Sequence, residues 1–194
     1  HAGAARFAFN WGLARVKAAL AQRDAERTYG VPDAELTDVP WTLYSLRLEW
    51  NRAKDIVAPW WAECSKEAYT AGLSNLARGL KNFTASRKGK RKGRRIGFPH
   101  RKRKNRVRDS FRYTTGCFGP DGDRHVKLPR VGRVKTCEAM GKLTSRLADG
   151  TAKMMSASVS RTAHRWHVSF TVEMERDVPE SSPRRGGTVG VDLG

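Results

Sequence analysis

The sequence predicts an α+β protein whose first half is helical and whose second half is an antiparallel β unit. Two observations predict this division. Apolar residues recur at the spacing of amphipathic helices up to residue 83, and from residue 110 they alternate with polar residues, as in strands buried on one face. A run of basic residues separates the two patterns.

The first predicted helix covers residues 4–27. Its apolar residues recur at helical spacing and are Phe7, Trp11, Ala14, Ala18 and Ala21. Residues 30–40 contain two prolines and several acidic turn residues, so we expect the helix to end before them.

Two further helices are predicted before the basic run. The second should begin at a capping residue, Thr42 or Asp38, and end before Pro59. Its apolar stripe is Leu43, Leu46, Trp50, Ala53 and Val57. The third covers residues 63–83, with one apolar face made of Tyr69, Leu73, Leu76, Leu80 and Phe83. Three such helices would form a small helical subdomain.

After the basic run the apolar period changes to two. We expect short strands at residues 110–115, 125–128 and 131–136, with a Gly/Pro/Asp turn at residues 118–123. Residues 152–160 and 166–175 predict a hairpin whose inner face carries Trp166, Val168, Phe170 and Val172. Together these strands favour a compact antiparallel unit, a small barrel. Residues 178–187 then predict a linker, and residues 188–194 a buried strand that opens another domain.

The composition is that of a strongly basic folded protein. The 194 residues include 38 Lys and Arg against 19 Asp and Glu, a formal charge of +19, and 39% of them are hydrophobic. This apolar content argues against a disordered polycation. No stretch approaches the roughly 20 apolar residues of a membrane span and no signal peptide is evident, so we expect a cytoplasmic protein. The three cysteines form no CxxC pair, which argues against a disulfide framework or a complete zinc site.

Most of the excess charge lies in one segment. Thirteen of the 22 residues from 87 to 108 are Lys or Arg, and none is acidic. Such a block repels itself, so we expect it to stay extended until a polyanion neutralises it. Nucleic acid is the obvious polyanion, because each neutralised phosphate releases counterions; a solvated tail or a localisation signal is the alternative. The predicted binding residues are Arg87, Lys88, Lys90, Arg91, Lys92, Arg94, Arg95, Arg101, Lys102, Arg103, Lys104, Arg106 and Arg108.

One carboxylate is a candidate for catalysis. Asp192 follows the apolar run Val189-Gly190-Val191. A carboxylate at the end of a buried strand is costly unless it is paired or binds a metal. Ribonuclease-H-like nucleases place their first metal-binding aspartate on such a strand, where two divalent ions organise an attack on phosphate. A turn or capping residue is the alternative for an isolated aspartate of this kind.

Several stretches, in order, resemble one family. They are Arg6-Phe7-Ala8-Phe9-Asn10-Trp11, the helix at 65–83, Gly97-Phe98-Pro99-His100-Arg101-Lys102-Arg103, Ser110-Phe111-Arg112-Tyr113, Leu128-Pro129-Arg130-Val131-Gly132-Arg133-Val134-Lys135 and Gly190-Val191-Asp192-Leu193-Gly194. The series resembles the TnpB (OrfB-type) proteins of bacterial insertion sequences, which are also called transposases and are related to the type V CRISPR effectors. His100-Arg101 departs from the family's usual Phe-Lys after Phe98-Pro99.

The resemblance implies an organisation and an activity. Residues 1–86 would be a helical recognition subdomain and 87–109 a basic linker. Residues 110–177 would be an oligonucleotide-binding-like barrel, the wedge domain. Residues 178–187 would be a second linker, and 188–194 the first strand of a RuvC-like nuclease domain. The chain would be a piece cut at both ends, with the remaining carboxylates and a Zn²⁺ ribbon beyond Gly194.

In that family the partners are a guide RNA and target DNA, with no membrane, and Mg²⁺ or Mn²⁺ serves phosphodiester cleavage. Asp192 would then be both catalytic and a metal ligand. Residues to test first for contact with bases are Tyr44, Arg47, Arg52 and Lys54. A non-catalytic RNA- or DNA-binding module, or an inactive mobile-element remnant, is the alternative. The sequence gives no oligomeric state.

Overall fold

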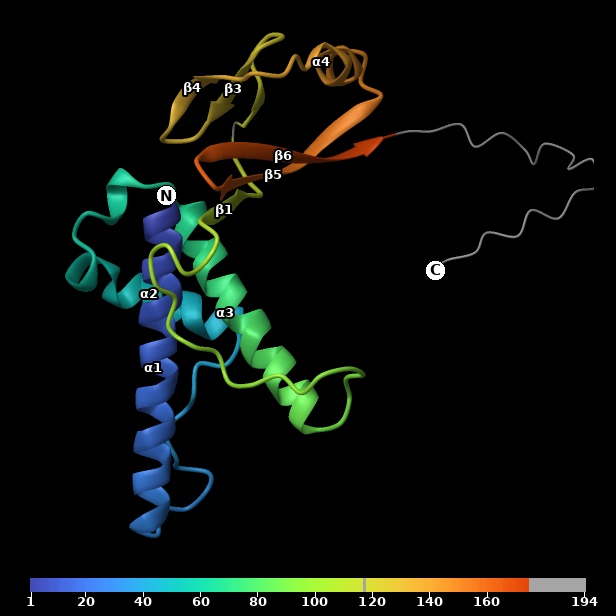
Figure 1. Cartoon of the computed structure of the whole chain (residues 1–194). Coiled ribbons are helices and arrows are strands. Elements are labelled where there is room, and N and C mark those ends of the chain that lie inside the picture. Colours follow the sequence, from blue (N-terminus) through green and yellow to red (C-terminus); the bar gives the residue numbers. More distant parts are fainter. Residues whose placement is uncertain (117, 175–194) are drawn as a thin grey trace, which may run out of the picture.

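The computed structural model describes residues 1–116 and 118–174. Three helices of the first half pack together beside two small antiparallel sheets, so the α+β class is confirmed (Figure 1). The helical half consists of α1 (Ala2–Thr28), α2 (Leu43–Val57), a short 3-10 helix (Trp61–Glu63) and α3 (Lys66–Arg87). The second half consists of β1 (Ser110–Tyr113), β2 (Gly119–Pro120), β3 (His125–Leu128), β4 (Gly132–Lys135), α4 (Gly141–Ala148), β5 (Ala152–Thr162) and β6 (Arg165–Met174).

The first helix forms as predicted, but the predicted buried face is wrong. Ala14, Ala18 and Ala21 are exposed, and Phe7 and Trp11 are only half-buried. The residues that α1 buries are mostly small and are Ala4, Ala5, Ala8, Phe9, Gly12, Leu13, Val16 and Ala19. Small residues let the backbone of α3 approach closely, and this packing, not the spacing of the largest side chains, decides which face is buried.

The second and third helices form as predicted, with two differences. The helix α3 runs from Lys66 to Arg87 and not over 63–83, and Val57 of the predicted apolar stripe of α2 is exposed. The Thr42 hydroxyl accepts from the Ser45 N–H at 3.1 Å, and the Ser45 side chain accepts from the Thr42 N–H at 3.1 Å, so Thr42 caps α2. The indole of Trp50 stacks on the ring of Tyr69 in α3, with ring centroids 5.0 Å apart. The apolar face of α3 is buried as expected, and Leu73, Leu76 and Leu80 are 0% exposed.

The described residues form two three-stranded sheets and no closed barrel, which corrects the expected barrel. The first sheet has the order β1-β5-β6 and contains the predicted hairpin, with Thr162 opposite Arg165. Val168, Phe170 and Val172 share its half-buried face, whereas Trp166 is exposed. The second sheet has the order β2-β3-β4, and β2 occupies part of the predicted turn. Among the described residues no ladder joins the two sheets. Between β4 and β5 the chain forms α4, a helix that the apolar pattern did not indicate.

The helices and both sheets share one hydrophobic core, to which β3 of the second sheet contributes Val126 and Leu128. Phe111 and Tyr113 of β1 are 7% and 0% exposed and belong to the same buried cluster as the apolar faces of α1 and α3. The Tyr113 hydroxyl donates to the Pro129 carbonyl at 2.9 Å, which connects β1 to the second sheet. Among the described residues, no helix is long and apolar enough to cross a lipid bilayer.

Candidate nucleic-acid interface

The basic segment follows a defined path over the helices. We define the basic strap as residues 87–109. It leaves the far end of α3, forms a loop, and runs back across the helical half to the start of β1 (Figure 1). Hydrogen bonds hold it at several points along its length. The Ile96 N–H donates to Ser86 Oγ at 2.9 Å, the Lys102 backbone pairs with the Asn10 side chain, and Arg6 pairs with Asp109 at 2.6 Å.

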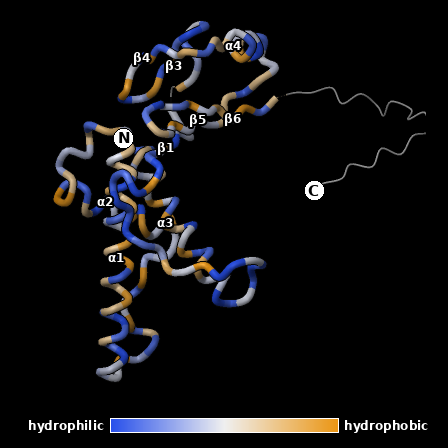
Figure 2. Tube along the Cα trace, in the orientation of Figure 1, coloured by the Kyte–Doolittle hydropathy of each residue, from blue (hydrophilic) through white to orange (hydrophobic). Residues whose placement is uncertain are grey.

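The middle of the strap is fixed by apolar residues. The ring of Phe98 lies between those of Phe83 and Trp41, with centroid separations of 5.2 and 6.3 Å. Pro99 packs on α3 at Gly79, where an added Cβ would lie 3.3 Å from the proline Cγ. Figure 2 shows the strap as a mostly hydrophilic trace with a short hydrophobic stretch where it crosses the helices. The uncharged residues therefore dock, and the charged residues on either side are left in solvent.

Twelve of the thirteen predicted binding residues in the strap are exposed, and Lys102 is the exception. The Lys102 ammonium lies over the Phe9 ring, 4.1 Å from its centroid. Burial, and then the nearby Arg78 charge, lowers the pKa of Lys102 below its ordinary value. The expectation that the strap stays extended and unpacked is therefore wrong at this point: one of its lysines helps to hold it on α1.

The candidates on α2 have different surroundings. Tyr44 is 79% exposed, and Arg47 and Arg52 are exposed. Lys54 instead lies over the Trp61 ring, 3.7 Å from its centroid, so part of its role is to pack the 3-10 helix. None of these four residues lines the hollow described next.

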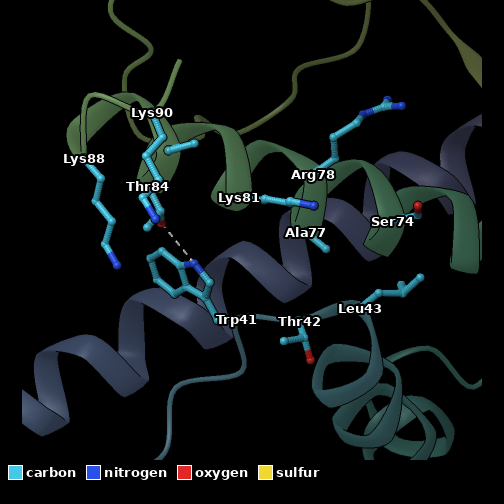
Figure 3. A pocket seen from close by; sticks show the side chains of 11 residues that line it. Trp41, Thr42, Leu43, Ser74, Ala77, Arg78, Lys81, Thr84, Lys88 and Lys90 are labelled. Atoms are coloured by element: carbon cyan, nitrogen blue, oxygen red, sulfur yellow. Dashed lines mark hydrogen bonds between the residues drawn. The ribbon is translucent and has the colours of Figure 1, made fainter.

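A hollow of about 630 Å³ lies between α3 and the start of α2 (Figure 3). This hollow was not predicted from the sequence. One signal was present: Arg78, Lys81 and Lys88 recur at spacings of three and seven, which place them along one side of α3 and its C-cap. Its described lining residues are Trp41, Thr42, Leu43, Ser74, Ala77, Arg78, Lys81, Thr84, Ala85, Lys88 and Lys90. The hollow is therefore lined both by residues of the helical half and by Lys88 and Lys90 at the start of the strap.

The predicted catalytic residue Asp192, the linker at 178–187 and the strand at 188–194 lie outside the described residues. Within residues 1–116 and 118–174, no three His, Cys, Asp or Glu side chains are grouped so that they could hold a metal ion. The described part of the chain therefore supplies no metal site, and no cleavage step can be derived from its geometry.

Three known proteins that are similar in sequence to this chain have the same descriptive name. Two sequences from strains of Mycobacterium tuberculosis are each 34% identical to it over 202 aligned positions, and InsQ of Escherichia coli is 26% identical over 193. Each of these alignments covers 100% of the chain, and all three proteins are named "Putative RNA-guided DNA endonuclease". The chain is homologous to parts of these three proteins. This confirms the resemblance to TnpB (OrfB-type) proteins that the short motifs indicated.

The aligned region is only part of the length of these three proteins. The chain spans 42% of the mycobacterial proteins and 40% of InsQ, or about two fifths of each. No model of a protein family matches the chain.

Proposed function

We propose that this chain is the nucleic-acid-binding portion of an RNA-guided DNA endonuclease. The observation that carries the proposal is the basic strap, whose uncharged residues dock on the helices while twelve of its cations face solvent. A polyanion would find the backbone that carries these charges already docked, so little backbone conformational entropy would be lost when it binds. The names of the homologues support RNA and DNA as the polyanions.

We assign the parts of the chain as follows. Residues 1–86 form a recognition unit for the target DNA, and the strap at 87–109 binds the phosphates of the guide RNA and of its duplex with DNA. Residues 110–177 form the wedge unit against the guide RNA, and 178–187 link it to a RuvC-like domain that begins at 188–194. Mg²⁺ or Mn²⁺ would serve cleavage there, with Asp192 among its ligands.

The salt dependence of RNA binding tests the role of the strap. The variant Arg101→Ala/Arg103→Ala/Lys104→Ala removes three exposed charges and keeps Lys102, whose loss would also disturb packing on Phe9. Each phosphate contact contributes roughly 0.7 to 0.9 to the log–log slope of affinity against salt, so the slope should become shallower by about 2 to 3. Fluorescence anisotropy with a labelled single-stranded RNA measures it.

The matched control removes three exposed cations outside the strap and outside the unit assigned to the guide RNA, as Lys17→Ala/Arg27→Ala/Lys66→Ala. If binding follows net charge alone, both triple variants will lower the slope equally, and the strap will lose its assigned role. If it follows the strap, the control slope will stay close to that of the wild-type chain.

A further inference from the structure

The hollow between α2 and α3 has two kinds of wall. Trp41, Leu43, Ala77 and Ala85 supply apolar surface, while Arg78, Lys81, Lys88 and Lys90 supply cations, and none of the described lining residues is acidic. In Figure 3, Lys88 and Lys90 lie on the Trp41 side, Lys81 lies nearer the middle, and Arg78 extends away. Three lysines therefore line the hollow, and their long, flexible side chains can turn toward a small, negatively charged ligand.

The indole ring of Trp41, the aromatic residue of the hollow, is held in place by two contacts. The Trp41 indole N–H donates to the Thr84 hydroxyl of α3 at 3.2 Å (Figure 3). The ring of Phe98, from the strap, packs against Trp41 at a centroid separation of 6.3 Å. Trp41 is thus fixed before any ligand enters, and an aromatic surface fixed in this way stacks a nucleobase without regard to its identity.

We propose that this hollow binds one unpaired nucleotide, with its base against Trp41 and its phosphate between Lys81, Lys88 and Lys90. The proposal rests on the proposed function and adds a site to it. The volume of about 630 Å³ lies within the roughly 300–1,000 Å³ of small-molecule sites, so it takes a single nucleotide and not a duplex. Charge selects an anion, and the apolar wall selects an anion that carries a flat ring.

The position of the hollow supports a nucleotide that belongs to a longer strand. Lys88 and Lys90 line the hollow and also begin the strap. A strand whose phosphates follow the strap would reach the hollow at its end, where an unstacked base can turn inward. Thr42, at the start of α2, also lines the hollow, so the positive end of a helix dipole adds to its positive potential.

Binding of adenosine monophosphate to the 194-residue chain tests the site. The reporter is the NMR signal of the Trp41 indole N–H, assigned with the variant Trp41→Phe. We expect adenosine monophosphate to shift this signal and to bind at least about tenfold more tightly than inorganic phosphate or adenosine alone. The variant Lys81→Ala/Lys90→Ala should weaken that binding about tenfold, and the control Lys127→Ala/Lys153→Ala, which removes two exposed lysines of the sheets, should leave it unchanged.

Three results would overturn the site. These are no shift of the Trp41 signal, equal affinities for the nucleotide and for inorganic phosphate, and equal weakening by the two double variants. Circular dichroism melting confirms that each variant is folded. Failure of the proposed function is distinguishable, because in that case single-stranded RNA shows no strap-dependent salt slope, whatever adenosine monophosphate does.

Discussion

Glu67 is a buried charged residue with three hydrogen bonds, and it ties α3 to the segment that follows β1. Its carboxylate accepts from the Thr114 N–H at 3.1 Å, the Thr114 hydroxyl at 2.6 Å and the Thr115 hydroxyl at 3.1 Å. Burial acts to raise the pKa of Glu67, but these hydrogen bonds outweigh it and hold the pKa below the ordinary value of 4.5. The charged form is therefore favoured in the folded state.

The variant Glu67→Gln tests this residue. Because the folded pKa is lowered, the carboxylate stabilises the fold above its ordinary pKa of 4.5, and this contribution is lost as the pH falls through the lower folded pKa. We expect the variant to lose roughly 1–3 kcal/mol of unfolding free energy at pH 7. Urea unfolding between pH 3 and 7 should also show a flatter pH dependence for the variant. Parallel profiles for the two proteins would contradict the assignment.

Asn10 holds the strap at a single point. Its amide donates to the Lys102 carbonyl at 2.9 Å, and its side-chain oxygen accepts from the Lys102 N–H at 2.8 Å. This pairing satisfies both backbone groups of Lys102 where the strap crosses α1. At this crossing, therefore, a side chain of α1 holds the backbone of the strap.

We expect Asn10→Ala to cost roughly 1–3 kcal/mol and to speed hydrogen exchange at the Lys102 amide. RNA affinity should fall as well, since the strap would have to be ordered upon binding. Hydrogen exchange read by NMR measures the first effect and anisotropy measures the second. The control Asn51→Ala alters an exposed asparagine of α2 and should change neither. Unchanged exchange at Lys102 in the Asn10 variant would show that the pairing does not hold the strap.

At the scale of elements, the contact between α1 and α3 depends on glycine. A Cβ added at Gly72 of α3 would overlap the Ala5 carbonyl oxygen of α1 and lie 3.1 Å from the Phe9 nitrogen. Backbone cannot move aside as a flexible side chain can, so the helices could keep their present separation only with a glycine at this position. The buried face of α1 is made of small residues for the same reason.

The variant Gly72→Ala should therefore destabilise the protein by about 1–3 kcal/mol or more, although alanine favours helices. Gly3→Ala is the matched control, because Gly3 lies in α1 with no atom within 4 Å of an added Cβ. The control should be neutral or more stable by up to about 1 kcal/mol. Thermal unfolding of both variants measures the contrast, and equal melting temperatures would contradict the close approach.

At the scale of the whole molecule, charge and core have separate locations. The helices and both sheets share one buried cluster, and the strap lies across the outside of that core. Among the described residues, the exposed cations of the strap thus lie on the surface of a packed core. The same residues contain no group of three or more side chains that could hold a metal ion.

We expect the 194-residue chain to bind RNA but not to cleave DNA, because a single carboxylate at Asp192 cannot hold two metal ions. A plasmid-cleavage assay with Mg²⁺ and a guide RNA measures this. Cutting by the purified chain that survives Asp192→Ala would contradict the expectation. Cutting that this substitution abolishes would instead show that Asp192 acts with partners in this chain.

The sequence by itself determined the class, the number of long helices, the β hairpin and the location of the cationic strap. Each of these follows from local periodicity or from composition, which nearby residues fix. Short motifs also indicated the resemblance to TnpB (OrfB-type) proteins, with which the names of the similar proteins agree.

Only the tertiary structure decided how these parts meet. It selected the small-residue face of α1, placed Phe98 between Phe83 and Trp41, and half-buried Lys102 over Phe9. It also formed the hollow from residues far apart in sequence, such as Trp41 and Lys90. These features depend on contacts between distant segments, whose geometry is set by packing, and a pattern along one segment does not encode them.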